Sequence, residues 1–316
     1  MYALSRECFV IDKLDLFWRF VNERQLVWHR RFVEKRDPPW TDDLILRHNR
    51  FTNVYRELDP GTRYAMEGIL GTDNTAKSKA FNIMFYRLIG AKETHRAVGF
   101  LNPDSFDSAA VISKMKSLRS AGKHVFTGAY LVSPYSNEGA NDKIINVASL
   151  FKRISSGFSG AWNRLSSAGS AEEAYSVIRG IDGFGDFLSY QVLVDLLYPI
   201  KSMEGKSLLP FSNDDFVVPG PGARRGISMM LDGEAEINGA EVVRWLRGNQ
   251  KQEFQRLCLK FPYLKDGSGK EILLTLANVQ NCLCEFHKYV KISEGTGRAR
   301  RRFIEPLHLP QSASLR

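Results

Sequence analysis

Two adjacent aspartates, Asp214 and Asp215, are candidates for catalytic residues because of their type and position. They follow Asn213 at the start of a loop, downstream of a pair of glycines in an apolar run. A carboxylate near a DNA-binding hairpin can act as a base or stabilise charge in reactions on flipped nucleotides. Aspartates are also frequent turn formers, so a purely structural role is the alternative.

A second group of polar residues occurs in the stretch NRFTNVYRELDPGT. A helix over residues 47–59 would place Arg50, Asn53 and Glu57 on one face, with Arg56 beside it. Such a face can line a buried polar site that binds a substrate. It can equally be a solvated, salt-bridged helix surface.

The glycine pair lies in IDGFGDFLSYQVLVDLLYP, where Gly183 and Gly185 flank Phe184 between two expected helices. Glycines allow a tight bend, and the N–H groups that begin the second helix can bind a phosphate oxygen. This predicts a helix-hairpin-helix contact with DNA that reads no sequence. In the alternative, Gly180 caps the first helix and the other glycines only form a tight turn.

Arg224 and Arg225 follow glycines in PGPGARRG, where two guanidiniums and backbone N–H groups could bind a phosphate or pyrophosphate. Neither this run nor DGSGKE has the spacing of a Walker A motif, so we do not expect a P-loop kinase. Cys282 and Cys284 have no second cysteine pair or histidine cluster, so no zinc site is expected.

The chain is basic, with a formal net charge of +9 and a pI near 9.3. Four arginines stand within five positions near its end: Arg298, Arg300, Arg301 and Arg302. This charge favours an anionic partner, and nucleic acid is favoured over a membrane surface. A basic surface that only contacts solvent would give the same net charge. No secretory signal and no transmembrane run is seen, so we expect a cytoplasmic protein without a membrane partner.

The elements that must position these residues are expected to be mostly helical. Ser170 and Glu173 form a capping box before a helix that stops at Gly180, and the helix after the hairpin should end at residues 198–199. The one strand candidate covers residues 124–132. Apolar periodicity predicts the other helices, over residues 13–32, 47–59, 76–88, 106–119, 143–154, 240–248 and 272–289.

Five segments taken together resemble a known family: RFTNVYRELD, FTGAY, GFGDFLSYQVLVDL, DDFVVPGPGARRG and LCEFHKY, in this order. The chain resembles the alpha-glutamyl/putrescinyl thymine pyrophosphorylases of phages, also called amino acid:DNA transferases. The same helical domain is attached to 5-hydroxymethyluracil DNA kinases. The resemblance covers most of the chain, from the first helix to LCEFHKY.

This resemblance implies a mainly α fold similar to helix-hairpin-helix DNA glycosylases, with two helical lobes, a DNA cleft between them and a base flipped from the duplex. The glycosylase-like domain would cover residues 1–295, with a lobe boundary near 135–165, and a basic tail would cover 296–316. The substrate would be double-stranded DNA carrying 5-pyrophosphoryloxymethyluracil, made by a hydroxymethyluracil DNA kinase in a phage-infected host. An amino acid or polyamine would displace pyrophosphate from the 5-methylene carbon and leave a hypermodified thymine.

Carried onto this chain, the resemblance assigns DNA contacts to the hairpin, and Asp215 or Asp214 falls where the glycosylase-like fold keeps its aspartate. We prefer Asp215, because it directly precedes the run Phe216-Val217-Val218. Asp215, Asp214 or Glu57 would then accept the proton of the amine. The leaving pyrophosphate would be stabilised by Arg224, Arg225 and Arg56, and Tyr55 and Phe51 would stack on the flipped base.

No cofactor is required by the sequence, although a divalent metal carried by the pyrophosphate is compatible with this chemistry. The tail arginines would add phosphate attraction that salt weakens. Two alternatives stay open: a glycosylase acting on a modified pyrimidine, and a non-catalytic DNA-binding accessory of the kinase.

Overall fold

The computed structural model describes residues 4–127, 139–231 and 237–297, and the chain divides into two compact units. The first unit combines Met1–Val54, Pro221–Leu274 and Asn281–Arg316, and the second combines Tyr55–Gly220 with Thr275–Gln280. Residues 135–165, where the sequence suggested a lobe boundary, lie inside the second unit.

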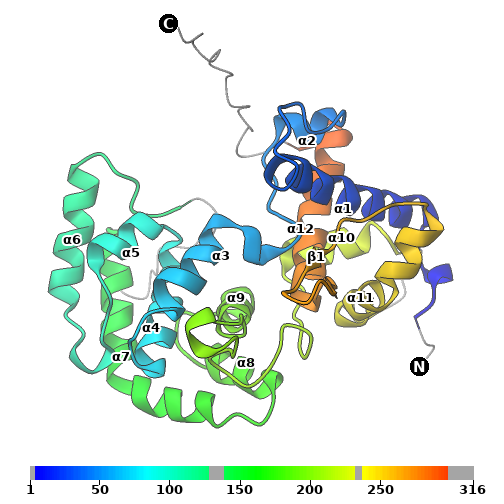
Figure 1. Ribbon diagram of the computed structural model, residues 1–316. Coiled ribbons are helices and arrows are strands. Elements are labelled where there is room, and N and C mark those ends of the chain that lie inside the picture. Colours follow the sequence, from blue (N-terminus) through cyan, green and yellow to red (C-terminus); the bar gives the residue numbers. More distant parts are fainter. Residues whose placement is uncertain (1–3, 128–138, 232–236, 298–316) are drawn as a thin grey trace, which may run out of the picture. The chain divides into compact units, whose positions relative to one another are not determined.

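The first unit is built from helices drawn from both ends of the chain (Figure 1). The helix α12 is shared by the two units. Its residues up to Gln280 belong to the second unit, and those from Asn281 onward belong to the first. The elements are η1 (Arg6–Cys8), α1 (Ile11–Phe32), α2 (Leu44–His48), α10 (Pro221–Ser228), α11 (Gly239–Arg256), β1 (Leu264–Lys265), β2 (Glu271–Ile272) and α12 (Leu276–Ser293).

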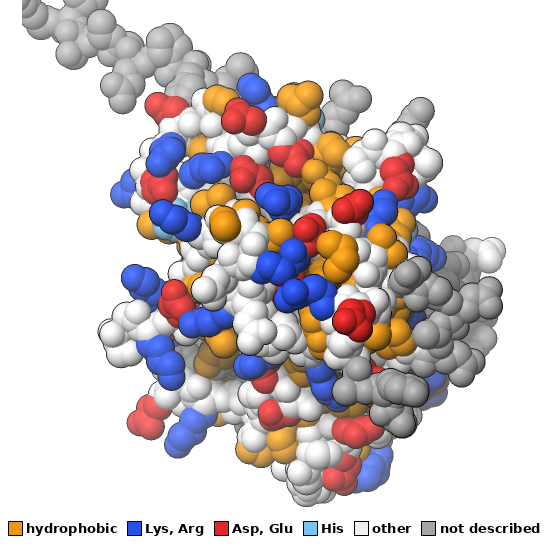
Figure 2. All heavy atoms as spheres, turned by 90° about the vertical axis from the view of Figure 1, so that its right-hand side faces the viewer, with side chains coloured by type: hydrophobic (Ala, Val, Ile, Leu, Met, Phe, Trp, Pro, Cys, Tyr) orange, Lys and Arg blue, Asp and Glu red, His pale blue; other side chains and the backbone are white. Residues whose placement is uncertain are grey.

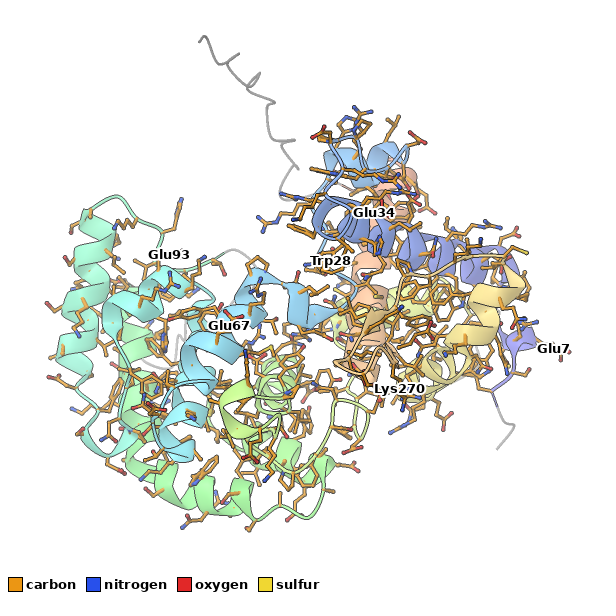
Figure 3. The ribbon with its side chains drawn as sticks, in the orientation of Figure 1. Glu7, Trp28, Glu34, Glu67, Glu93 and Lys270 are labelled. Atoms are coloured by element: carbon orange, nitrogen blue, oxygen red, sulfur yellow. The ribbon has the colours of Figure 1, made fainter. Side chains whose placement is uncertain are left out.

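Aromatic side chains form the core of this unit. The ring of Phe17 on α1 packs edge-on against Phe286 of α12, with centroids 5.4 Å apart. Trp18 makes a similar contact with Phe254 of α11 at 4.9 Å. β1 and β2 pair as a short antiparallel hairpin, with Lys270 in the connection between them (Figure 3).

The second unit is entirely helical among its described residues. Its short turns are η2 (Arg56–Leu58), the π-helical turn η3 (Ala65–Leu70), η4 (Pro103–Ser105) and η6 (Lys201–Met203). Its helices are α3 (Pro60–Tyr64), α4 (Ala76–Ile89), α5 (Lys92–Val98), α6 (Ser108–Ser120), α7 (Lys143–Ser166), α8 (Ala171–Arg179) and α9 (Asp186–Leu196).

The core of the second unit surrounds α4, which is buried from Ser78 to Ile89. α7, α9 and η3 pack against it (Figure 1). Phe81 contacts Phe151 and Phe158 of α7 at 5.2 and 4.9 Å between ring centroids. A helix that is buried on all sides can carry polar side chains only where they have hydrogen-bond partners. The polar residues of α4 should therefore each be paired inside the unit.

Asn82 of α4 orients a buried histidine. Its side-chain N–H group donates to the carbonyl oxygens of Ser78 and Leu101, which leaves Oδ1 to accept from His95 Nε2 at 3.1 Å. His95 Nδ1 is then the acceptor for the Tyr64 hydroxyl at 2.8 Å. Burial lowers the pKa of His95 to about 4. Exposed carboxylates such as Glu67 and Glu93 lie on the outside of η3 and α5 (Figure 3).

Most of the expected helices are confirmed within a few residues, although α7 and α11 run further than predicted. The capping box is confirmed in part. Ser170 accepts from the Glu173 N–H at 3.1 Å, but the Glu173 carboxylate accepts from the Gly169 N–H at 2.7 Å.

Three predicted elements differ from the structure. A continuous helix over residues 47–59 is wrong, because α2 ends at His48 and extended backbone follows before η2. The strand candidate is not seen in residues 124–127, and residues 128–132 lie outside the described ranges. Glu271 and Ile272 form β2, so the last helix begins at Leu276. In the described parts of the chain, no helix is both long and apolar enough to cross a membrane.

Candidate active site

The short turn η2 places a buried arginine in the second unit. Arg56 is only 5% exposed, and its guanidinium donates to Gln191 Oε1 of α9 at 2.7 Å. Its backbone N–H donates to Asn278 Oδ1, at the start of α12, at 3.0 Å. Pro60, at the first position of α3, fixes the end of this turn. Arg56 therefore ties together three segments that are distant in the sequence.

Glu57, the next residue, has a carboxylate oxygen aimed into the same interior. Its Oε2 atom is buried and has no hydrogen-bond partner among the residues that the structure describes. Burial raises the pKa of Glu57 above its ordinary value, while the charge of Arg56 opposes that rise. A carboxylate whose pKa is raised is a stronger base than an exposed carboxylate, which suits it to accept a proton.

α9 supplies the other wall of this cluster. Gln191 and Asp195 are one helical turn apart on α9, Tyr198 follows just beyond the end of the helix, and all three are buried. Asp195 accepts two hydrogen bonds from Arg87 of α4 in a buried, bidentate ion pair. Such a pair adds little net stability, but loss of either partner would leave an unpaired buried charge. It holds α9 in register with α4.

Three further side chains of the second unit carry a buried polar atom without a partner. The hydroxyls of Tyr190 and Tyr198 and the Oδ1 atom of Asn213 are buried, and none finds a hydrogen-bond partner in the described part of the chain. Burial raises the pKa of both tyrosines, and the charge of Arg56 acts on each of them. The hydroxyls are therefore neutral donors at neutral pH. We call Arg56, Glu57, Tyr190, Gln191, Tyr198 and Asn213 the polar cluster.

Asp214 and Asp215 lie at the edge of this region in different environments. The exposed Asp215 accepts from the Ser212 N–H at 2.8 Å and from its hydroxyl at 2.9 Å, as a turn-forming aspartate does. Asp214 is half-buried, and its Oδ1 accepts from the Leu276 N–H at 3.0 Å. Of the three candidate carboxylates, Glu57 is the one whose oxygen is both buried and unpaired, so the geometry favours it as the base.

The residues expected on one helix face with Glu57 are separated by the end of α2. Arg50 is exposed and belongs, with Asn53, to the first unit, where Asn53 Oδ1 accepts from Arg24 at 3.1 Å. Tyr55 belongs to the second unit and is fully buried. The shared face is wrong, because it required a helix that residues 49–55 do not form.

Arg224 and Arg225 lie on a helix and not in a glycine-rich loop. α10 begins at Pro221, and its residues Gly222 and Gly226 share one face. A Cβ atom at Gly222 would overlap Cys284 of α12, and one at Gly226 would overlap the Leu283 carbonyl. These glycines therefore allow close packing of two helices. Arg224 and Arg225 are exposed.

The glycine pair forms a bend between α8 and α9, as expected. Gly183 has φ +82°, a conformation that side chains disfavour, whereas Gly185 has φ −77° and open space where a Cβ would lie. The Phe184 side chain is 2% exposed and anchors the bend in the core, so it is not available for a contact with a partner. Asp186 begins α9 and pairs with Arg179 at 2.5 Å.

Basic charge is not concentrated in the second unit. That unit contains 18 Lys and Arg against 17 Asp and Glu, which leaves 26 against 18 for the first unit. The face in Figure 2 shows positive and negative side chains interspersed. Arg298, Arg300, Arg301 and Arg302 lie outside the described residues. Within the described ranges, no three His, Cys, Asp or Glu side chains gather as a metal site.

Sequence reasoning missed the contribution of α9. Gln191 and Asp195 are polar residues four positions apart in α9, whose other buried residues are mostly apolar, and Tyr198 follows just after the helix ends. Polar residues on one face of a buried helix need partners, so this pattern was a usable signal. For Asn278 and Arg87, no comparable spacing in the sequence indicated a role in this site.

Comparison with known proteins places the chain in a family. Residues 12–298 match the family described as "5-hmdU DNA kinase, helical domain", and the chain belongs to that family.

A related protein is the 5-hmdU DNA kinase of Bacillus phage SP10, which is 29% identical over 287 residues. The match covers 87% of this chain but 44% of the phage protein, so the chain spans less than half the length of that relative. No solved structure matches.

Proposed function

We propose that this protein acts in the hypermodification of thymine in phage DNA, as a transferase that attaches an amine to a modified base. The observation that carries the proposal is the Glu57 carboxylate beside Arg56, whose Oε2 atom is buried without a partner, in a chain of the 5-hmdU DNA kinase helical family. A module that only bound DNA phosphates would gain nothing from keeping such a carboxylate in its interior.

The substrate is double-stranded DNA in which a hydroxymethyluracil DNA kinase has supplied 5-pyrophosphoryloxymethyluracil. The nitrogen of an amino acid or polyamine forms a bond to the 5-methylene carbon, and the carbon–oxygen bond to pyrophosphate breaks. The leaving pyrophosphate keeps the electron pair, and the nitrogen loses one proton. The reaction takes place in the cytoplasm of an infected bacterial cell.

In this reaction Glu57 accepts the proton of the amine, because its raised pKa makes it a stronger base than an exposed carboxylate. Arg56 is a fixed positive charge that stabilises the departing anion. Asp214 and Asp215 remain candidates for holding the ammonium form of the amine. A divalent ion, if used, is held by the pyrophosphate oxygens.

The target base has to leave the duplex to reach an interior carboxylate, so the protein flips it, as other enzymes that react with bases do. The α8–α9 bend is proposed as a helix-hairpin-helix contact that holds the DNA through a phosphate. Arg224, Arg225, Arg50 and the tail arginines would add phosphate attraction without reading sequence.

One experiment tests the proposal. The purified protein is incubated with DNA carrying the pyrophosphorylated base and a mixture of amino acids and polyamines, and the digested nucleosides are identified by mass. Amine adducts are expected. Abasic sites would show a glycosylase instead, and DNA that is bound but unchanged would show a binding module.

A further inference from the structure

The C-terminal end of α1 exposes an aromatic side chain to solvent. Phe32, the last residue of this helix, is 54% exposed, and Val33 beside it is exposed to the same extent. In the described part of the chain, Phe32 is the only exposed aromatic residue, since the others are buried or half-buried. Single aliphatic residues are common on protein surfaces. An exposed ring with an apolar neighbour is better suited to contact a partner.

Neighbouring side chains hold the Phe32 ring in place. The Arg31 guanidinium lies over this ring, with its Cζ atom 4.8 Å from the centroid, and also lies over the Trp40 ring at 4.9 Å. Trp28, one turn earlier, contacts Phe32 at 6.0 Å between ring centroids. Trp28 and Glu34 mark this end of α1 in Figure 3. Phe32 is therefore supported by its neighbours without being covered by them, so it is preorganised to stack on a ligand.

Positive charge beside Phe32 favours an anionic partner. Arg31 lies against the ring, and Lys35 is exposed three residues later. Arg36 is paired with Glu34, whereas no ion pair of Lys35 is found among the residues that the structure describes. Two apolar residues among charged ones form too small a patch for a stable protein interface. Nucleic acid fits better, because the unit carries 26 Lys and Arg against 18 Asp and Glu.

Lys35 is held in a backbone conformation that lysine disfavours. Its φ is +53°, in the left-handed region where glycine is the usual residue after a helix end. The Arg36 N–H donates to the Arg30 carbonyl at 2.9 Å and closes the helix end around this residue. Two other described non-glycine residues, Glu204 and Cys258, share the positive φ. Glycine would fit position 35 without strain, so a lysine there is best explained by the charge that it carries.

We propose that the end of α1 contacts DNA where its bases are unstacked. The Phe32 ring stacks on an exposed base, and Arg31 and Lys35 contact the neighbouring phosphates. An aromatic ring beside cations can bind unpaired nucleic acid without reading its sequence, because every base has a face on which a ring can stack. A fully paired duplex offers phosphates but no such face along its length. The inference rests on the proposed function, in which the duplex opens when the target base leaves it.

Binding to paired and opened DNA tests the stacking contact. Fluorescence anisotropy is measured with two labelled duplexes that share one strand, one fully paired and one with three mismatched pairs at its centre. The wild type should bind the mismatched duplex about 10-fold more tightly. Phe32→Leu keeps an apolar side chain but removes the aromatic face, so it should lose most of that preference. Ile11→Ala is the control, because it changes an exposed apolar residue at the other end of α1 and should keep the preference.

Lys35→Gly separates the charge from the stability of the fold. It removes the strained conformation, so the thermal midpoint should not fall. Affinity for both duplexes should nevertheless decrease several-fold, and the slope of log affinity against log salt should decrease by about 1. Cys258→Gly is the matched control, because it relieves a positive φ after α11 in the same unit and should leave DNA binding unchanged.

Three results would overturn the inference: a wild type without preference for the mismatched duplex, a Phe32→Leu variant that keeps the preference, or a Lys35→Gly variant with unchanged affinity. The adduct assay separates this inference from the proposed function. A preference that Phe32→Leu abolishes, in a protein that forms no adduct, supports the DNA contact and removes the transfer reaction. Adducts formed by the wild type, together with variants that bind DNA as the wild type does, remove the DNA contact alone.

Discussion

At the residue scale, the proposed function depends on side chains of the second unit that hold buried polar atoms without hydrogen-bond partners. Glu57 Oε2 and the two tyrosine hydroxyls are buried atoms without a hydrogen-bond partner, whereas the buried His95 is satisfied on both ring nitrogens. The contrast separates residues that a ligand can complete from residues that only stabilise the fold. Two predictions follow from single residues.

The first prediction concerns Glu57→Gln. It should reduce adduct formation by about 100-fold or more, because the proton acceptor is lost. Since burial raises the pKa of Glu57, ionisation destabilises the folded chain as pH rises above the ordinary carboxyl range, and glutamine removes that loss. The variant should therefore be at least as stable as the wild type at neutral pH, as thermal unfolding would show.

Asp215→Asn is the comparison variant for Glu57→Gln. Asp215 closes an exposed turn that asparagine can also close, so this variant should change stability by less than about 0.5 kcal/mol and keep most of its activity. An inactive D215N beside an active E57Q would return the catalytic role to Asp215. In the wild type, activity should rise with pH through the raised pKa of Glu57.

The second prediction concerns His95, whose pKa is lowered by burial to about 4 from an ordinary 6.5. Between these values the unfolded chain binds a proton that the folded chain does not. Stability should therefore fall as pH decreases from about 6.5 to about 4, by up to about 3 kcal/mol. His95→Gln can keep both hydrogen bonds and should flatten this dependence in denaturant titrations. An unchanged slope would contradict the assignment.

At the element scale, the glycines of α10 determine how closely it approaches α12. Gly226→Ala should destabilise the protein by about 2 kcal/mol or more, because the new methyl group overlaps the Leu283 carbonyl. Gly248→Ala in α11 is the control, since its Cβ meets nothing within 4 Å. That variant should gain about 0.5–1 kcal/mol from helix propensity. Chemical denaturation would measure both, and equal effects would rule out close packing as the cause.

The bend between α8 and α9 contains another pair of glycines, Gly183 and Gly185, which differ in backbone conformation. Gly183→Ala should cost about 1 kcal/mol of stability, because φ is +82°. Gly185→Ala should fold normally, yet weaken DNA binding several-fold if a phosphate approaches the open space beside it. Fluorescence anisotropy with a labelled duplex would measure this. Unchanged affinity in G185A would leave the bend as a structural turn.

At the scale of the whole molecule, the excess of positive charge belongs to the first unit, while the second unit holds the polar cluster. The proposed function thus assigns most side-chain attraction to DNA phosphates to the first unit, while the second unit contributes the α8–α9 bend and the chemistry on the base. Because counterion release depends on the number of phosphates neutralised, this assignment can be measured through salt dependence.

Replacing both Arg224 and Arg225 by alanine should weaken DNA binding and reduce the slope of log affinity against log salt by about 2. Both side chains are exposed, so folding should be unaffected. Arg164→Ala, an exposed arginine of the second unit, is the control and should change the slope by less than about 1. Equal changes in slope per arginine would place the phosphate contacts in both units.

Much of the secondary structure could be predicted because local rules determine it. Apolar periodicity located α1, α4 and α6, and Ser170 marked the start of α8. The helix predicted over residues 47–59 is wrong because its polar spacing suggested one helix face, whereas the segment is held extended by distant partners such as Arg24 and Asn281, which bond to Asn53. Propensity does not include such distant contacts.

The sequence by itself determined a mainly helical, basic protein, the hairpin between α8 and α9, and Arg56 and Glu57 as candidates for a polar site. Only the tertiary structure decided which carboxylate is buried and unpaired, that α9 lines the same site, and that the glycines of α10 serve helix packing. The physical reason is that periodicity and capping act over a few residues. Burial and hydrogen-bond satisfaction depend instead on segments such as η2, α9 and α12, which only folding brings together.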